Sequence, residues 1–423
     1  MPGRFLFVLI DGGGTVPPAL GLAAELVRRG HQVRVLSDPT VETQAQAVGS
    51  EFSPWREAPH FDSRADQTAV IAAAEGANPY RAIRALKAHL GKEMTRRFAD
   101  DVVRTVGEYP VDAVLSDAFP GMLLGAQATG LPTAALLANI YARPTTGLPL
   151  MGTGWSADGG MATRTRDRMA PAVVNWLLRR TLPRINRAAA VHGQAPLDEV
   201  FEVFDRCRRV LVMTSPSFDF VGGRLPLNVR YVGPVLDDPP WAAAVEWARP
   251  DPRPLVLVAM SSVYQGQAGV LRRIAQGLGQ LPISAVLTTG NAIAPEEIDA
   301  PSNVQVLRAA PHRRVMAEAS VVVTHAGHGS TMKTLSAGVP LVCMPMGRDQ
   351  KDNTVRVLRL GAGVRLNPQA SADAIAEAVS EVLHNPSYSA AARRFAAVLA
   401  AEATSRPSAA DEAEGLLRAP GHR

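Results

Sequence analysis

The sequence predicts an α/β protein of two domains, each built around a parallel β-sheet that is wrapped by helices. Three observations predict this fold class. The chain has 423 residues, which is too long for one typical core and suits two domains of about 200 residues each. Short β-branched apolar segments alternate with amphipathic segments in both halves, as in repeated βαβ units. Between the halves, prolines and aspartates replace this periodic pattern over residues 233–254.

The first half opens with a strand at Phe5–Ile10, a glycine turn and a helix at Pro18–Arg29. Gly30 and His31 end that helix before a second strand at Gln32–Ser37. The alternation continues with segments at Asp112–Asp117, Leu123–Thr129, Thr133–Ala138 and Val210–Thr214. Because crossovers between parallel strands are right-handed, these segments predict one parallel sheet with helices packed on it.

Residues 139–170 break this alternation with repeated prolines and glycines. The residues that interrupt the pattern are Pro144, Gly147, Pro149, Gly152, Gly154, Gly159 and Gly160. A long loop in a compact domain is usually functional, so we expect residues 139–170 and 56–90 to form the walls of a ligand pocket. We place the first domain at residues 1–230, the linker at 231–254 and the second domain at 255–423.

The second half restarts the same alternation. Its expected strands and helices lie at Leu255–Met260, Gly269–Leu278, Ser284–Leu287, Val304–Leu307, Val321–Val323, Met332–Ala337 and Leu341–Met344. Residues 371–384 and 389–402 are rich in alanine and predict two further helices. The tail from Arg406 onwards is compatible with either helix or disorder.

The composition is that of a globular protein, with 47% hydrophobic and 20% charged residues. The net charge of +5 would suit a nucleic-acid partner, but the basic residues are scattered and few aromatic residues accompany them. They lie on predicted helix faces such as that of Arg81, Arg84 and Lys87, or in the loop at residues 164–168. We interpret them as solvated faces that attract anions weakly, and expect no nucleic-acid partner.

The expected compartment is the cytoplasm. Cys207 and Cys343 are far apart in the chain and form no disulfide framework, so buried free thiols in a reducing compartment are the default. The first apolar segment is too short for a signal sequence, and no run of about 18 apolar residues predicts a membrane span. A homodimer is left open.

Residues 311–353 carry the clearest chemical pattern. The valine run at Val321–Val323 ends at Thr324 and His325, and small residues then lead into a helix through Gly327 and Gly329. Free N–H groups and the positive end of the helix dipole converge at such a turn, which therefore predicts an anion cradle. The side chains of Ser330, Thr331 and His325 supply further donors. A lone pair of glycines with a capping serine would equally suit an ordinary strand-to-helix turn.

The next strand, Leu341–Met344, ends in a segment that contains Asp349 and Gln350. Ligands of open α/β sheets bind outside the carboxyl ends of the strands, so these side chains point to the same crevice as the cradle. A carboxylate and an amide beside a phosphate suit the hydroxyl groups of a nucleotide sugar.

This pattern resembles the donor-binding signature of nucleotide-sugar-dependent glycosyltransferases of the UDP-glycosyltransferase-like family, above all the actinobacterial natural-product enzymes. The matching residues are His325, Gly327, Gly329, Ser330, Gly338, Val339, Pro340, Pro345, Asp349, Gln350 and Asn353. The resemblance implies the GT-B fold, in which two Rossmann-like domains face each other across a cleft. It implies that the first domain binds the acceptor and the second binds a nucleoside-diphosphate sugar, which is a co-substrate rather than a cofactor. It also implies that the C-terminal tail packs back on the first domain.

Further donor-site residues follow by position in the same resemblance. Ser261 and Ser262 end the first strand of the second half and are placed at the phosphates or at an interdomain contact, although a polar strand end is an equal alternative. His312 is placed beside the nucleobase. Lys333 stands where many UDP-using relatives carry a glutamate that accepts both ribose hydroxyls, and a lysine has no acceptor. The nucleotide dTDP lacks the 2′-hydroxyl and therefore loses less by the absence of this glutamate. UDP-glucose and dTDP-sugars are both compatible donors.

The catalytic base is the main departure from the resemblance. Relatives carry a histidine in the first glycine turn as the general base, and this chain has Thr15 there, whose hydroxyl cannot act as a base at neutral pH. Two carboxylates at strand ends, Asp11 and Asp117, are the available replacements, and burial in a cleft would raise the pKa of either. We prefer Asp117 slightly, and a turn-capping role is the simpler interpretation of Asp11.

The resulting prediction is an inverting hexosyltransferase that acts on a small hydrophobic natural product, through oxygen or carbon. His325 and the helix start at Gly329–Thr331 are expected to stabilise the departing diphosphate, and no Asp-x-Asp ends a strand, so no metal is expected. A GT-B epimerase or phosphorylase and a non-catalytic nucleotide-sugar-binding partner are the alternatives. The acceptor cannot be read from loops.

Overall fold

A computed structural model describes residues 2–63, 65–66, 93–157, 159–221, 225–238, 242, 244–249, 251–260, 267–290 and 293–418. The chain forms two compact units. Unit 1 comprises Met1–Leu150, Ala157–Val235 and Ser405–Arg423, and unit 2 comprises Met151–Ser156 and Leu236–Thr404. The chain therefore passes between the units more than once. Residues 151–156 belong to unit 2 although both flanking segments belong to unit 1, and the tail belongs to unit 1 although it follows unit 2 in the sequence.

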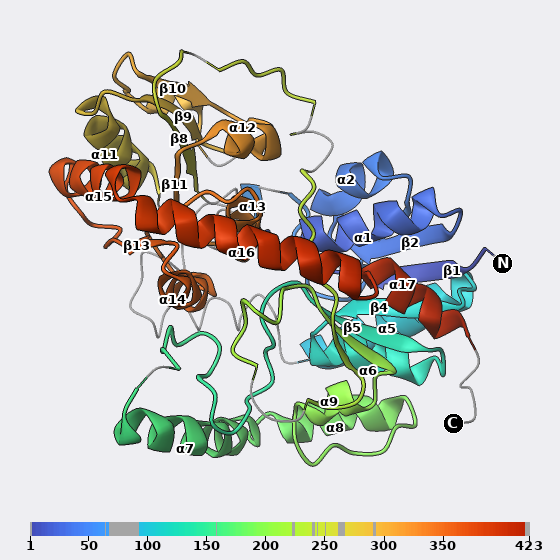
Figure 1. Cartoon of the computed structure of the whole chain (residues 1–423). Helices are drawn as coiled ribbons and strands as arrows, with labels where there is room; N and C mark the ends of the chain where they lie inside the picture. The colour runs from blue at the N-terminus through green and yellow to red at the C-terminus, as the bar shows by residue number, and fades with distance from the viewer. Residues whose placement is uncertain are drawn as a thin grey trace. The chain divides into compact units, whose positions relative to one another are not determined.

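Unit 1 contains a seven-stranded parallel sheet in the order β3-β2-β1-β4-β5-β6-β7 (Figure 1). Its strands are β1 (Arg4–Val8), β2 (Gln32–Ser37), β3 (Glu51–Pro54), β4 (Ala113–Asp117), β5 (Thr133–Leu137), β6 (Arg209–Val212) and β7 (Val229–Tyr231). The central strands are buried on both faces, as near-continuous apolar runs require. The strand order reverses direction between β1 and β4, which is the switch point where open α/β sheets bind ligands.

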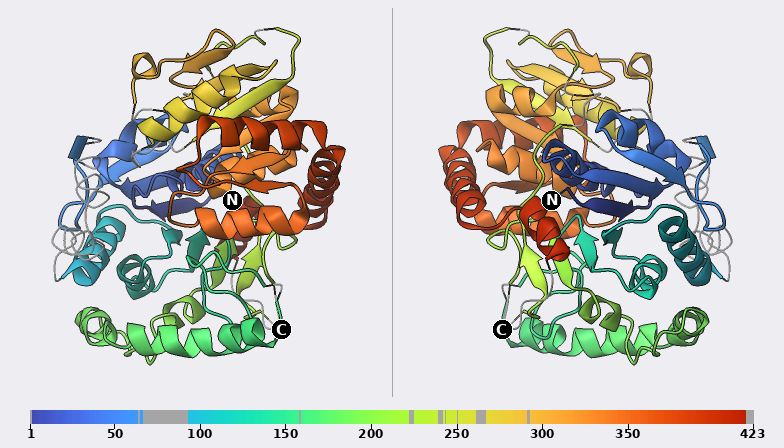
Figure 2. Two further views of the ribbon diagram at one scale, coloured as in Figure 1. Left: turned by 90° about the vertical axis from the view of Figure 1, so that its left-hand side faces the viewer. Right: turned by 90° about the vertical axis from the view of Figure 1, so that its right-hand side faces the viewer.

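Helices cover both faces of this sheet (Figure 2). In the described part of the chain, the helices of unit 1 before the tail are α1 (Val16–Arg28), η1 (Pro39–Val41), α2 (Glu42–Ala47), α5 (Met94–Glu108), α6 (Pro120–Ala128), α7 (Met161–Leu178), α8 (Leu182–Val191) and α9 (Glu202–Asp205). Helices α5 and α6 pack closely because a Cβ atom on Gly125 would lie 2.8 Å from the Cα atom of Ala99. The prediction of a loop over residues 139–170 is wrong at its end, since α7 begins at Met161 and tolerates Pro171 in its interior.

Unit 2 contains a six-stranded parallel sheet in the order β10-β9-β8-β11-β12-β13. Its strands are β8 (Leu255–Ala259), β9 (Ser284–Thr288), β10 (Val304–Leu307), β11 (Val321–Thr324), β12 (Leu341–Cys343) and β13 (Gly363–Arg365). Its helices are α11 (Ala268–Gly279), η2 (Pro295–Glu297), α12 (His312–Glu318), α13 (His328–Ser336), α14 (Gln350–Leu360), α15 (Ala372–His384) and α16 (Pro386–Ser405). The reversal of strand order lies between β8 and β11, and it is equivalent to the reversal in unit 1.

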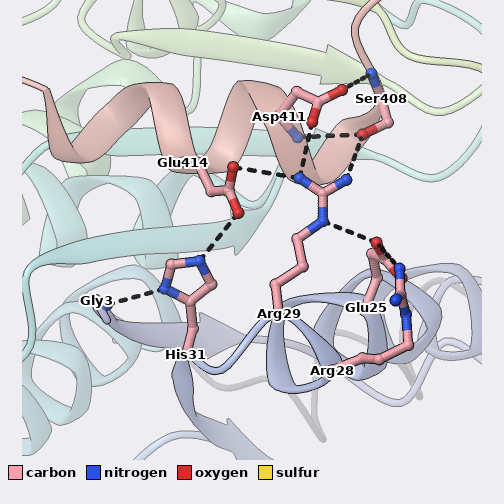
Figure 3. Close-up of polar contacts among 8 residues, drawn as sticks. All are labelled: Gly3, Glu25, Arg28, Arg29, His31, Ser408, Asp411 and Glu414. Carbon is pink, nitrogen blue, oxygen red and sulfur yellow. Dashed lines mark hydrogen bonds and ion pairs between the residues drawn. The ribbon is translucent and has the colours of Figure 1, made fainter. Parts of the chain in front are cut away.

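The tail of the chain completes unit 1. Helix α17 (Ala409–Glu414) and the turn η3 (Gly415–Leu417) place Ala410, Ala413 and Leu416 in the same apolar core as α1 and β1. Ion pairs fix the tail at its edge, where the Arg29 guanidinium contacts Asp411 at 2.7 Å and Glu414 at 3.2 Å (Figure 3). The predicted ambiguity between helix and disorder is thus resolved in favour of helix over Ala409–Glu414, followed by the 3-10 turn that ends at Leu417.

The prediction of two parallel-sheet α/β domains is confirmed by this architecture. None of the helices in the described part of the chain is long and apolar enough to cross a membrane.

Candidate functional site

The first helix turn after β11 forms a cradle at the carboxyl edge of the unit 2 sheet. Ala326 adopts a left-handed backbone with φ of 64°, which is held because Asn353 Nδ2 donates a hydrogen bond of 3.0 Å to its carbonyl oxygen. Gly327 precedes α13, and a Cβ atom there would lie 2.4 Å from His325 Nε2. A Cβ atom on Gly329 would meet no atom within 4 Å among the described residues, so the space in front of the helix start is open.

Two buried polar atoms at this cradle have no hydrogen-bond partner among the described residues. They are His325 Nδ1 and Thr331 Oγ1. Burial lowers the pKa of His325 to about 4, although the nearby Asp349 carboxylate and the backbone of Ala259 oppose this effect. The imidazole is therefore neutral at pH 7 and offers one N–H group. Since unpaired buried polar atoms are rare, this pair fits a bound group with acceptor oxygens.

The loop after β12 is arranged by side chains of α14. Gln350 Oε1 accepts hydrogen bonds from the backbone N–H groups of Met346 at 2.7 Å and Gly347 at 2.9 Å. Asn353 Nδ2 also donates to Asp349 Oδ2 at 2.7 Å, which links Asp349 to the cradle. The amide oxygen of Gln350 thus supports the loop, while the Asp349 carboxylate is oriented by the same asparagine that holds Ala326.

A second buried group lies on the other side of α13. Lys333 Nζ contacts Asp238 Oδ1 at 2.7 Å, and Asp238 Oδ2 accepts the backbone N–H of Arg313 at 2.8 Å. The His312 ring lies close by, with Nε2 at 3.1 Å from Thr288 Oγ1. Burial lowers the pKa of His312 to about 4, against the attraction of Asp238. The lysine is therefore engaged by a carboxylate from the segment before unit 2's first strand.

A carboxylate of α14 also binds the short segment of unit 2 that comes from residues 151–156. Asp352 Oδ2 accepts the N–H of Gly152 at 2.6 Å, and Oδ1 accepts the N–H of Gly154 at 2.8 Å. Both glycines have positive φ angles, and a Cβ atom on Gly154 would lie 2.5 Å from Lys351 Cβ. Burial raises the pKa of Asp352, and the two hydrogen bonds oppose that rise.

An open cavity of about 480 Å³ lies beside the loop that follows β12, at the ends of β12 and β13. It is lined by Pro345, Met346, Lys351, Arg365, Asn367 and Pro368. Its two basic side chains make it suited to polar or anionic groups.

Unit 1 carries carboxylates at the ends of three adjacent strands. Asp11 follows β1, Asp38 follows β2, and Asp117 ends β4. Asp38 Oδ2 accepts the N–H of Asp11 at 2.9 Å. The Asp11 carboxylate is occupied in turn, because it accepts the hydroxyl of Thr40 at 2.6 Å and the N–H of Gly13 at 3.2 Å. This arrangement favours the turn-forming interpretation of Asp11.

Asp117 differs from Asp11 in its surroundings. Its Oδ2 atom accepts the N–H of Ile10 at 2.9 Å. Burial raises the pKa of Asp117 to about 7, with a smaller contribution from Asp38, and the hydrogen bond from Ile10 opposes the rise. Thr15 lies five residues after Ile10, and the Thr15 hydroxyl points to the carbonyl oxygen of Ile10 at 3.5 Å. A carboxyl group with this pKa exchanges protons near neutral pH.

The structure thus groups the predicted residues into two sets, one in each unit. His325, Gly327, Gly329, Ser330, Thr331, Asp349 and Gln350 lie around the cradle or on the loop beside it, with Lys333 and His312 behind it. Asp11, Thr15 and Asp117 lie at the switch point of unit 1. Ser261 and Ser262 lie outside the described residues, as do residues 67–90 of the segment expected to line a pocket.

Sequence reasoning missed Asp38 and Asp238. Asp38 could have been found by the strand-end rule that identified Asp117, since it directly follows Ser37 at the end of β2. Asp238 belongs to an Asp-Asp pair in the linker, and no local pattern connects it with a lysine so far along the chain.

Comparison with known proteins defines the class. The profile described as "Erythromycin biosynthesis protein CIII-like, C-terminal domain" matches residues 272–418. The glycotransferase of kitacinnamycin superposes with a TM-score of 0.70 at 25% identity, over 99% of this chain and 100% of that chain. The protein is therefore a glycosyltransferase with the GT-B fold.

Within this class, the relatives to which the chain is similar include actinobacterial natural-product enzymes. The 4'-demethylrebeccamycin synthase of Lentzea aerocolonigenes is 28% identical over 99% of this chain and 100% of its own length. The oleandomycin glycosyltransferase of Streptomyces antibioticus is 26% identical over 99% of this chain and 92% of its own length. The resemblance seen in the sequence is confirmed, since the chain is similar over nearly its whole length to glycosyltransferases of antibiotic biosynthesis.

Proposed function

We propose that this glycosyltransferase moves a hexose from a nucleoside-diphosphate sugar to a small hydrophobic acceptor, with inversion at the anomeric carbon. The observation that carries the proposal is the open helix start at Gly329, where His325 Nδ1 and Thr331 Oγ1 are buried and have no hydrogen-bond partner among the described residues. A diphosphate would supply acceptor oxygens for the hydrogen bonds of these two donor groups. The first N–H groups of α13 add the positive end of the helix dipole.

In this proposal the acceptor attacks the anomeric carbon from the face opposite the diphosphate. The bond between the anomeric carbon and the diphosphate oxygen breaks, and both bonding electrons go to the leaving group. Charge therefore develops on the diphosphate, where a fixed neutral imidazole and a helix start stabilise it without reorganisation. A neutral His325 contributes as a hydrogen-bond donor rather than as a cation.

We infer that Asp117 accepts the proton of an attacking hydroxyl. A base is most effective when its pKa is near the operating pH, and Asp117 has a pKa of about 7. Asp11 is less suited because both of its carboxylate oxygens already accept hydrogen bonds. The raised pKa of Asp117 also favours an enzyme over a non-catalytic binding partner, since a binding site has no need of a proton acceptor.

For the donor nucleotide we propose a dTDP-sugar. At the position of Lys333, relatives that use UDP present a glutamate to both ribose hydroxyls. Here the lysine is held by Asp238, so this position offers no free acceptor to a 2′-hydroxyl. The oriented carboxylate of Asp349 is the proposed partner of the sugar hydroxyls. The free, buried cysteines Cys207 and Cys343 suit the cytoplasm as the compartment.

A screen of donors against acceptors, read by mass spectrometry, tests the proposal. Purified protein is incubated with UDP-glucose or dTDP-hexoses and a panel of phenols, macrolides and flavonoids, with and without EDTA. A product heavier than the acceptor by one hexose supports transfer, and nuclear magnetic resonance of that product reports the anomeric configuration and the O- or C-linkage. Conversion of the donor itself with every acceptor unchanged would indicate an epimerase. Nucleotide binding by calorimetry without any turnover would indicate a binding protein.

A further inference from the structure

Helix α7 presents an apolar stripe to solvent. Its most exposed large apolar residues are Met161 (85%), Met169 (60%), Trp176 (59%), Val173 (50%) and Leu177 (48%). Met169, Val173, Trp176 and Leu177 recur at helical spacing and form one stripe, while Asp167, Ala170 and Pro171 of the same helix are buried. In both views of Figure 2 this helix runs along the edge of unit 1, beside α8. Exposed apolar stripes of this kind mark interaction sites.

The same helix pair carries a concentrated positive charge. Residues 161–191 contain seven arginines and one aspartate, which gives a net charge of +6 against +5 for the whole chain. The single aspartate, Asp167, is buried and paired with Arg166. The six other arginines are exposed and form no ion pair with the described part of the chain, namely Arg164, Arg168, Arg179, Arg180, Arg184 and Arg187. The basic residues of this protein are therefore concentrated on this helix pair, whereas the sequence pattern had indicated that they are scattered.

The combination of features selects the occupant. A second copy of this chain on a two-fold axis would bring the same arginines face to face, which like-charge repulsion disfavours. A nucleic acid would neutralise the arginines but leave the stripe in water. An anionic membrane surface meets both requirements, because phosphate headgroups lie directly above an apolar layer.

We propose that α7 and the start of α8 form a surface that docks on anionic lipid membranes. The helix lies in the plane of the interface, with Met169, Val173 and Leu177 at the acyl boundary and the arginines at the headgroup phosphates. Trp176 belongs at the headgroup level, where indole rings are enriched, and the Arg180 guanidinium lies 5.3 Å from its ring centroid. This proposal does not depend on the proposed donor or acceptor.

Vesicle flotation with the full chain tests the proposal. Vesicles of phosphatidylcholine mixed with phosphatidylglycerol are expected to carry the protein at low salt, and vesicles of phosphatidylcholine alone are not. The Arg179→Gln/Arg180→Gln variant should weaken the partition coefficient about thirtyfold at low salt, since each basic residue near an anionic surface contributes roughly a factor of five. Trp176→Gln/Leu177→Gln should weaken it about tenfold or more by removing buried apolar area.

Leu227→Gln is the matched control, because Leu227 is 80% exposed and lies outside the stripe. It should leave binding unchanged. Equal binding to neutral vesicles, or anionic binding that survives both double variants, would overturn the proposal. So would absence of vesicle binding together with a dimer that Trp176→Gln/Leu177→Gln converts to monomer in sedimentation. As a second measurement, brominated lipids in anionic vesicles should quench more fluorescence in the wild type than in Trp176→Phe, and equal quenching would contradict an inserted stripe.

Discussion

The two units share a strand order but differ in how their strand ends treat polar groups. At the switch point of unit 1, carboxylates of Asp11 and Asp38 are satisfied by neighbouring backbone and hydroxyl donors, and Asp117 keeps a pKa near 7. At the switch point of unit 2, small residues leave open space, and two buried polar atoms have no partner among the described residues. One edge is therefore suited to accepting a proton and the other to receiving an anion.

This difference shows that the fold supplies a location and the side chains supply the chemistry. Parallel strands deliver their carboxyl ends to the same edge in both sheets. What lies there is decided by a few residues after each strand, which are acidic after β1, β2 and at the end of β4 in unit 1 and small or hydroxylated after β11 in unit 2. Substitutions of these groups one at a time test this difference between the two units.

The largest effect is expected at Asp117. Asp117→Asn should lower kcat by about 10²- to 10⁴-fold, because the amide cannot take a proton while its oxygen can still accept the N–H of Ile10. The measurement is steady-state turnover with the acceptor that the donor-by-acceptor screen identifies. Asp11→Asn is the control and should lose far less activity. If instead Asp11→Asn abolishes turnover and Asp117→Asn does not, the assignment of the base is reversed.

The pH dependence sharpens the same contrast. Below the Asp117 pKa of about 7 the carboxyl group is protonated, so kcat/KM should fall about tenfold per pH unit as the pH drops. Between pH 3.8 and about 7, Asp117 holds a proton in the folded state, whereas the same side chain has released it in the unfolded chain. The contribution of Asp117 to stability is therefore lost as the pH rises through that window.

Denaturant unfolding at several pH values provides the check on stability. Asp117→Asn should remove part of the decline in the free energy of unfolding between pH 4 and 7, and a slope identical to that of the wild type would place the raised pKa elsewhere.

The unit 2 cradle is tested by two threonines on one helix. Thr331→Val should weaken dTDP binding about tenfold, because it removes a hydroxyl that has no partner among the described residues and is available to a phosphate. Thr334→Val should leave binding unchanged, since that hydroxyl already donates to the carbonyl oxygen of Ser330 at 2.7 Å. Calorimetry with dTDP measures both.

His325→Ala should in addition lower kcat, and an unchanged rate would place the leaving group at another site.

The smallest effect concerns the choice of nucleotide. Lys333→Glu alone would set a second carboxylate beside Asp238, so the informative variant is Lys333→Glu/Asp238→Asn. It should shift the ratio of UDP to dTDP affinity toward UDP by a few fold, about 1 kcal/mol for one added hydrogen bond. Competition binding with the two diphosphates gives this ratio, and no shift would remove the argument based on Lys333.

The sequence predicted the strand-end residues well because their position follows from local periodicity. His325 and Asp117 each follow a run of apolar residues that can only be a buried strand. It predicted their partners poorly, because partners meet across long separations in the chain. Asn353 reaches Ala326, and Asp238 reaches Lys333, only once the sheet is assembled.

Helix α7 escaped prediction for a different reason. Pro171 lies inside it and a run of glycines precedes it, and both features ordinarily indicate a loop. Its apolar positions also face solvent rather than a core, so they could not be assigned to packing from their spacing alone.

The tail helix α17 has a consequence for how the protein is made. Ala410, Ala413 and Leu416 close the core around α1 and β1, yet they are translated after every strand of both sheets. The amino-terminal unit therefore cannot finish folding while its own sequence emerges from the ribosome, whereas unit 2 is complete as soon as α16 is. We expect released chains that are truncated before residue 408 to hold a folded second unit and an unfinished first one.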